Sequence, residues 1–155
     1  MMDRLAIWLA TCGRLGFVPV APGTFGSAAG LLVYYAIRWT GSSTVEALVI
    51  GGLCIVGVWS ATAAGRLLGS VDPGPVIIDE VVGMLITLWL LPVTPLGALV
   101  GFLLFRALDI VKPFPANRLE ALSGGVGVMA DDVMVGVYGN LMIRGLIVLT
   151  PGWLV

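Results

Sequence analysis

Residues 76–112 read VIIDEVVGMLITLWLLPVTPLGALVGFLLFRALDIVK. Its middle contains an uncharged run of 25 residues, which at 1.5 Å per residue is long enough to cross a bilayer once as a single helix. Pro92 and Pro95 interrupt that run, and two prolines so close together break a helix. We therefore expect a hairpin of two short helices, one from about residue 76 to 91 and the other from about residue 95 to 111.

The composition of the chain is that of a membrane protein. Of its 155 residues, 59% are apolar and 11% are charged, and the mean hydropathy is +1.07. A soluble domain carries about a quarter of its residues as Asp, Glu, Lys and Arg. The length allows a single domain over residues 1–155. Eight basic and nine acidic residues give a net charge of −1, which excludes the basic surface of a nucleic-acid-binding protein.

Three further stretches are expected to form apolar helices. Residues 47–65 are 19 uncharged residues, the clearest single membrane span. Residues 27–39 follow a loop rich in Gly and Pro, and a last span begins near Asp131 or Asp132 and continues to residue 149. With the hairpin, the sequence predicts an all-α, multi-helical membrane bundle of about five short spans, preceded by an N-terminal interfacial helix.

The basic residues indicate how this bundle is oriented. With alternating spans, six of the eight basic residues fall on one side, and Arg38 and Arg144 fall on the other. Because loops rich in Lys and Arg stay in the cytoplasm, we expect the first side, which also carries most of the acidic residues, to face the cytoplasm.

Several catalytic chemistries are excluded by composition. The chain has no histidine, which rules out zinc sites of the usual kind and catalysis by Ser-His-Asp or Cys-His groups. Cys12 and Cys54 lack the spacing of a metal site and are expected to be small apolar fillers. Carboxylates, Arg, Lys and hydroxyl groups remain.

Charged residues gather at the two ends of the predicted hairpin. Asp79 and Glu80 stand near the start of its first arm, and Arg106, Asp109 and Lys112 stand near the end of its second. A fold at the two prolines brings both groups to the same membrane depth. The spacing of three residues on the second arm keeps its three charged side chains within one sector of about 120°.

Asp131 and Asp132 open the last predicted span on the same side, so that five carboxylates and at least two cations can converge. Neighbours in sequence diverge by about 100° on a helix, which leaves open whether both members of an adjacent pair bind directly. An N-cap is an equally good interpretation of Asp131 taken alone. As a set, however, ionisable residues beside membrane spans are costly and typical of a functional site.

Clustered carboxylates without histidine favour a hard cation, above all Mg²⁺. The candidate metal ligands are Asp79, Glu80, Asp109, Asp131 and Asp132. All of these except Asp109 are also the candidate catalytic residues, which would hold the metal or orient the attacking water. Arg106 and Lys112 would bind the oxygens of a substrate phosphate.

Two segments rich in glycine add a weaker indication of phosphate binding. Residues 16–27 lead into a helix start, where free amide groups and the hydroxyls of Thr24 and Ser27 could accept an anion. The segment lacks the Lys-Ser or Lys-Thr pair of a Walker loop, and a helix cap with a tight turn explains it equally well. Residues 124–129 could approach the same phosphate or form a purely conformational turn.

At these positions the sequence closely resembles the phosphatidylglycerophosphatase A family of bacterial membrane enzymes. The matching motifs are Pro22-Gly23-Thr24 with Gly26-Ser27, Ile78-Asp79-Glu80 with Gly83, Phe105-Arg106 with Asp109 and Lys112-Pro113 with Pro115, and Gly124-Gly125 with Gly127, Met129, Asp131-Asp132 and Gly136. They run from about residue 13 to 150, and Val135 is the one small departure, where a smaller residue is expected.

The resemblance implies a Mg²⁺-dependent phosphomonoesterase of the bacterial inner membrane. Its expected substrate is phosphatidylglycerophosphate, a membrane lipid, and its expected products are phosphatidylglycerol and phosphate. It also implies an all-helical fold with one central helix surrounded by others. The alternatives are a phospholipid phosphotransferase, whose longer Asp-rich motif is missing, and a small transporter, for which the middle of the spans lacks acidic residues. The sequence leaves the oligomeric state open.

Overall fold

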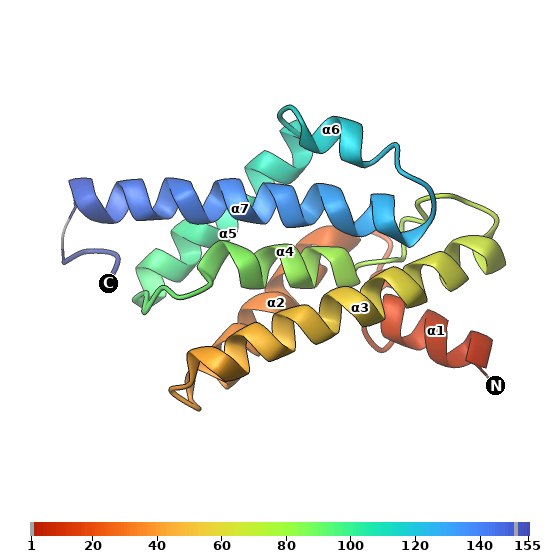
Figure 1. Ribbon diagram of the computed structural model, residues 1–155, viewed down its shortest axis with the longest axis horizontal. Coiled ribbons are helices and arrows are strands. Elements are labelled where there is room, and N and C mark those ends of the chain that lie inside the picture. The colour runs from red at the N-terminus through yellow and green to blue at the C-terminus, as the bar shows by residue number, and fades with distance from the viewer. Residues whose placement is uncertain (1, 151) are drawn as a thin grey trace.

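The computed structural model describes residues 2–150 and 152–155, and the described part is helical throughout its regular structure (Figure 1). The elements, in chain order, are α1 (Met2–Ala10), a 3₁₀ turn η1 (Leu15–Phe17), α2 (Pro22–Arg38), α3 (Ser43–Leu68), α4 (Ile78–Leu88), α5 (Pro95–Val111), α6 (Ala116–Leu119) and α7 (Gly125–Leu149). The all-α prediction is therefore confirmed.

The predicted hairpin is present as α4 and α5. The first arm is shorter than expected, because the chain leaves the helix at Trp89, before the first proline. The second arm begins with Pro95 in its first turn, where a missing N–H costs nothing. Thr94 caps it, since its hydroxyl accepts a hydrogen bond from the Gly97 amide at 3.2 Å.

Helix α4 is the centre of the molecule. Ten of its 11 residues are buried, and it packs against α2, α3, α5 and α7 (Figure 1). Small residues make this close packing possible: a Cβ on Gly83 would lie 2.9 Å from the carbonyl oxygen of Asp132, and one on Gly136 would lie 2.6 Å from that of Gly83. The central helix that the family resemblance implied is thus confirmed.

Two helices begin earlier than the sequence predicted. Helix α2 starts at Pro22 rather than near residue 27, and α7 starts at Gly125 rather than near Asp131. Glycine is a poor helix former, and for this reason both segments read as loops. The glycines are needed there because each faces a neighbour too closely for a side chain; a Cβ on Gly125 would lie 2.7 Å from Thr62 Oγ1. Asp131 is therefore inside a helix and is not an N-cap.

Within the described residues, α3 and α7 are long and apolar enough to cross a membrane. They have 26 and 25 residues, or nearly 40 Å at 1.5 Å per residue. Helices α2 and α5 have 17 residues each, and α4 has 11. The expected count of about five spans is thus supported for two helices. Outward-facing Leu32, Ile55 and Leu103 are more than half exposed, as suits contact with lipid.

A buried acid fixes the end of the bundle where the hairpin turns. Glu46, which is 4% exposed, accepts a hydrogen bond from the Leu90 amide and forms an ion pair with Arg38 at 3.0 Å. The Tyr34 hydroxyl donates a hydrogen bond to the Leu91 carbonyl. These contacts tie the hairpin turn to α2 and α3, and the charged residues of the motifs lie toward the opposite end.

Candidate metal and phosphate site

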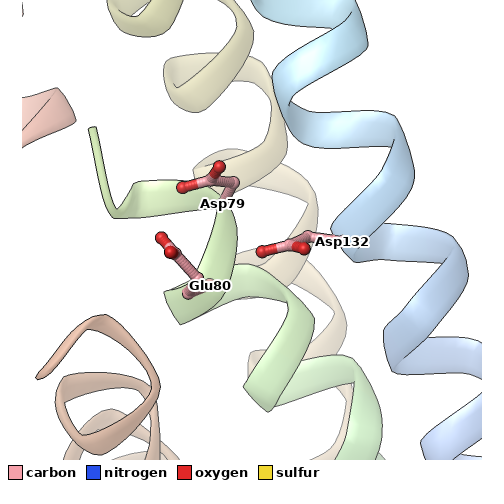
Figure 2. Close-up of side chains that lie close together, drawn as sticks. All are labelled: Asp79, Glu80 and Asp132. Carbon is pink, nitrogen blue, oxygen red and sulfur yellow. The ribbon is translucent and has the colours of Figure 1, made fainter. Parts of the chain in front are cut away.

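Three carboxylates meet where the start of α4 passes α7. Asp79 and Glu80 lie in the first turn of α4, and Asp132 projects toward them from the second turn of α7 (Figure 2). One oxygen from each residue lies within 4.8 Å of the others. Both members of the adjacent pair on α4 therefore reach the cluster, whereas of the pair on α7 Asp132 joins it and Asp131 points elsewhere.

The cluster has the properties of a cation site. Among the described residues, the buried side-chain oxygens without a hydrogen-bond partner are Asp79 Oδ1, Glu80 Oε2 and Asp132 Oδ2 in the cluster, and Asp131 Oδ1, whose companion Oδ2 contacts Lys112. Buried carboxylate oxygens without partners are strongly unfavourable, and three so close together also repel one another. A divalent cation with oxygen ligands would offset both effects, so this donor set fits a hard metal ion.

A guanidinium group lies next to the carboxylates. Arg106, from α5, forms an ion pair with Asp109 at 2.8 Å, one turn further along the same helix. Its Nη1 also lies 3.4 Å from the hydroxyl of the buried Ser27, which donates its own hydrogen to the Gly23 carbonyl at 2.9 Å. Asp109 and Ser27 thus orient Arg106, and in this arrangement the Ser27 hydroxyl oxygen accepts a hydrogen bond from the arginine.

Gly23 separates Arg106 from the carboxylates. A Cβ at this position would overlap Glu80 Oε1 and lie 2.9 Å from Arg106 Nη1. The start of α2 is therefore pressed against both groups, and it places an anionic and a cationic side chain on either side of a narrow space. This contact confirms that both arms of the hairpin bring their charges to the same level.

A second cation lies at the end of α5. Lys112 Nζ contacts Asp131 Oδ2 at 2.7 Å and Glu120 Oε1 at 3.1 Å. Burial acts to lower the pKa of Lys112, but the hydrogen bonds and charges of Asp131 and Glu120 outweigh it and hold that pKa above its usual value. Lys112 is therefore a permanent positive charge at the edge of the site.

The predicted site residues thus divide into three groups. Asp79, Glu80 and Asp132 form the carboxylate cluster, Arg106 with Asp109 and Ser27 forms its cationic neighbour, and Lys112 with Asp131 forms the edge. Thr24 lies half-buried in the first turn of α2. Glu120 was missed, because an exposed acid after a four-residue helix carries no recognisable spacing.

Cys12 lies near enough to the site for its pKa to be affected by Glu80. Burial, with a smaller contribution from the charge of Glu80, raises the pKa of its thiol to about 11. The thiol is therefore protonated at neutral pH, in agreement with its interpretation as a small filler.

Comparison with known proteins matches the sequence to a family. The family model of phosphatidylglycerophosphatase A matches residues 8–147, which include every residue of the site. The chain belongs to the phosphatidylglycerophosphatase A family. The resemblance read from the motifs is confirmed, and the chain is a phosphatase of this family.

Three relatives show how far the family extends. A Bacteroides thetaiotaomicron protein provisionally named phosphatidylinositol-3-phosphatase is 34% identical over 146 residues, covering 90% of this chain and 91% of its own. Phosphatidylglycerophosphatase A of Escherichia coli is 36% identical (79% and 72% covered), and that of Haemophilus influenzae is 34% identical (83% and 80% covered). No solved structure gives a significant match.

Proposed function

We propose that the protein is a Mg²⁺-dependent lipid phosphatase that hydrolyses phosphatidylglycerophosphate to phosphatidylglycerol and phosphate at the cytoplasmic face of the inner membrane. The proposal rests on the juxtaposition of three clustered carboxylates, two of them on buried residues, with an oriented arginine across Gly23. Two of the three relatives bear the corresponding name and support the choice of lipid.

The acidic and the basic residues of the site would have different roles. Asp79, Glu80 and Asp132 would hold the metal ion, which would offset the repulsion between the carboxylates and a phosphate dianion and polarise its oxygens. Arg106 and Lys112 would bind phosphate oxygens and stabilise the charge that develops during transfer. Asp109, Asp131 and Ser27 would position these two cations.

The reaction requires one proton to be moved. The oxygen of a water molecule attacks phosphorus, the bond between phosphorus and the ester oxygen breaks, and a carboxylate of the cluster accepts a proton from the attacking water. The departing lipid oxygen takes up a proton to become the free alcohol. The lipid headgroup would enter among these residues while its acyl chains stay in the membrane.

The name of the Bacteroides thetaiotaomicron relative favours a second candidate substrate, phosphatidylinositol 3-phosphate, which is also a lipid phosphate monoester. The two lipids offer the same reacting group on different alcohols. Phosphate release by the purified protein should therefore be measured with both lipids at equal surface concentration in mixed micelles. We expect faster release from phosphatidylglycerophosphate; faster release from the inositol lipid would replace our substrate, and no release from either would refute the proposed activity.

A methyl group added at Gly23 should impair the reaction more than the fold. Gly23→Ala is compatible with the helical backbone, but its Cβ displaces Glu80 or Arg106. Because a misplacement of about 1 Å in a site can cost on the order of 10²-fold in rate, we expect a loss of that size in phosphate release. Gly52→Ala, whose Cβ meets nothing within 4 Å, is the matched control. Equal activity of the two variants would show that the close contact at Gly23 is not needed for the reaction.

The proposed orientation can be tested by single cysteines in a background lacking Cys12 and Cys54. Ser70 and Asn117 lie in exposed segments toward the end of the bundle that carries the site, and Gly41 lies between α2 and α3 at the opposite end. In intact cells an impermeant thiol reagent should label the cysteine at Gly41, whereas labelling at Ser70 and Asn117 should require lysis. Labelling of the cysteine at position 117 in intact cells would show that the topology is the opposite of the one proposed.

A further inference from the structure

A second cleft, apart from the carboxylate cluster, lies between α1 and the turn that follows it. Its volume is about 420 Å³, and it is lined by Arg4, Ile7, Trp8, Arg14 and Phe17. The cleft therefore combines two guanidinium groups with an apolar and aromatic wall, and no carboxylate lines it.

The cleft forms because the chain reverses sharply after α1. Cys12, Gly13 and Arg14 all have left-handed backbone conformations, with φ of 47°, 71° and 79°. The turn is held by hydrogen bonds from the Gly13 amide to the Trp8 carbonyl at 2.8 Å and from the Gly16 amide to the Thr11 carbonyl at 3.0 Å. Left-handed backbone is costly for a residue such as Arg14, and here it brings this side chain to the same cleft as Arg4.

Both arginines lack an anionic partner. Within residues 2–150 and 152–155, neither guanidinium takes part in an ion pair, although four such pairs occur elsewhere. Asp3 precedes Arg4 in sequence but points about 100° away from it on the helix. Two like charges at one cleft favour an anion bound between them, and the fork of each guanidinium matches phosphate oxygens.

The surroundings of the cleft favour a lipid as the source of such an anion. Helix α1 packs against α3 through the buried Ala6 and Ala10, and it leaves Leu5 and Trp8 about half exposed (Figure 1). Phe17 continues this apolar surface beyond the turn. An exposed apolar surface with a tryptophan beside cations is typical of the boundary between hydrocarbon and headgroups.

The cleft also lies at the level of the carboxylate cluster. The Ile77 amide, just before α4, donates a hydrogen bond to the Ala10 carbonyl at 2.9 Å, so the end of α1 is joined directly to the start of α4. A headgroup held in the cleft would thus be at the same membrane depth as the headgroup processed at Asp79. Arg4 precedes the residues that the family model matches, and Arg14 lies within them.

We propose that this cleft is a second lipid site, in which Arg4 and Arg14 bind the phosphate of an anionic membrane phospholipid and Trp8 contacts its glycerol region. The site does not depend on which lipid is hydrolysed. It would anchor α1 to an anionic membrane surface beside the catalytic groups.

The test is a competition measured at Trp8 in the full chain, reconstituted in bilayers of brominated phosphatidylcholine. Bromine quenches nearby tryptophan, and the difference between the wild type and Trp8→Phe isolates the signal of Trp8 from that of the other four tryptophans. Unbrominated phosphatidylserine is then added. It is anionic and is neither substrate nor product of the proposed reaction, so failure here would leave the proposed function untouched.

We expect phosphatidylserine to displace phosphatidylcholine at Trp8 with about tenfold higher relative affinity, because each arginine near an anionic headgroup adds to the attraction. Arg4→Gln with Arg14→Gln should remove this preference. Arg66→Gln with Arg118→Gln removes the same charge from other exposed positions and should preserve it. A wild type without preference, or an equal loss in both double variants, would overturn the proposal, the latter by showing attraction to overall charge only.

Discussion

Asp79→Asn should lower the rate of phosphate release by about 10²- to 10⁴-fold, the range expected when a group that accepts or positions the reacting proton is removed. The substitution keeps the size of the side chain and removes one charge from three carboxylates whose oxygens lie within 4.8 Å of one another. In the absence of metal it should therefore leave the thermal midpoint unchanged or raise it, since repulsion within the cluster decreases.

The rate of phosphate release and the thermal midpoint together distinguish a functional carboxylate from a structural one. A lower midpoint together with lost activity would mean that Asp79 holds the fold. Near-normal activity would remove Asp79 from the mechanism. Asp3→Asn, at an exposed position of α1, is the control for removing an acidic charge.

Removal of divalent cations should abolish turnover. Without a cation, a phosphate dianion would have to approach carboxylates that are buried and unpaired, and Arg106 already has Asp109 as its partner. Phosphate release after dialysis against EDTA should fall to the background, and added Mg²⁺ should restore it. Ca²⁺ is a useful comparison, because it prefers more ligands at longer distances and should restore less activity.

Two outcomes of the same experiment would contradict the proposed metal site. Unchanged hydrolysis in excess EDTA after thorough dialysis would show that the carboxylates act without a metal ion. A purified protein that releases phosphate only with Mg²⁺, but equally well with Asp79→Asn, would place the metal somewhere other than the start of α4.

The hairpin could be predicted from sequence because its causes are local. Pro92 and Pro95 stop a helix whatever surrounds them, and Thr94 with Pro95 is a recognisable helix start. The shared level of Asp79, Glu80 and Arg106 followed from this feature, because a fold at the prolines determines which charges of the two arms lie at the same end. The long apolar helix α3 could be predicted for a similar reason, since an uncharged run of sufficient length needs no tertiary information.

The early starts of α2 and α7 could not be predicted, because their cause is tertiary. Gly23 and Gly125 are unfavourable in helices by propensity, and only their close contact with Glu80 and Thr62 explains why glycine is required. An earlier start of α7 also changes the environment of Asp131 and Asp132. Each lies within a regular helix, and helix rotation turns one to Lys112 and the other to the cluster.

The division between the two acidic pairs was likewise beyond the sequence. Spacing gave the same divergence for Asp79 with Glu80 as for Asp131 with Asp132. At the start of α4, the longer side chain of Glu80 reaches the same cluster as Asp79 (Figure 2). On α7, the two short aspartate side chains point in different directions, so that Asp132 reaches the cluster and Asp131 contacts Lys112. The ion pair between Lys112 and Glu120 could not be predicted either, because Glu120 is placed by a short helix that has no periodic pattern in the sequence.

We propose that Asp79, Glu80 and Asp132, rather than Asp131, form the cation site. Its most direct test is the binding of Mn²⁺ in competition with Mg²⁺, followed by electron paramagnetic resonance, in the wild type, Asp132→Asn and Asp131→Asn. We expect Mg²⁺-displaceable binding in the wild type, its loss in Asp132→Asn, and its retention in Asp131→Asn. Retained binding in Asp132→Asn, with loss in Asp131→Asn, would place the metal beside Lys112 and contradict this account.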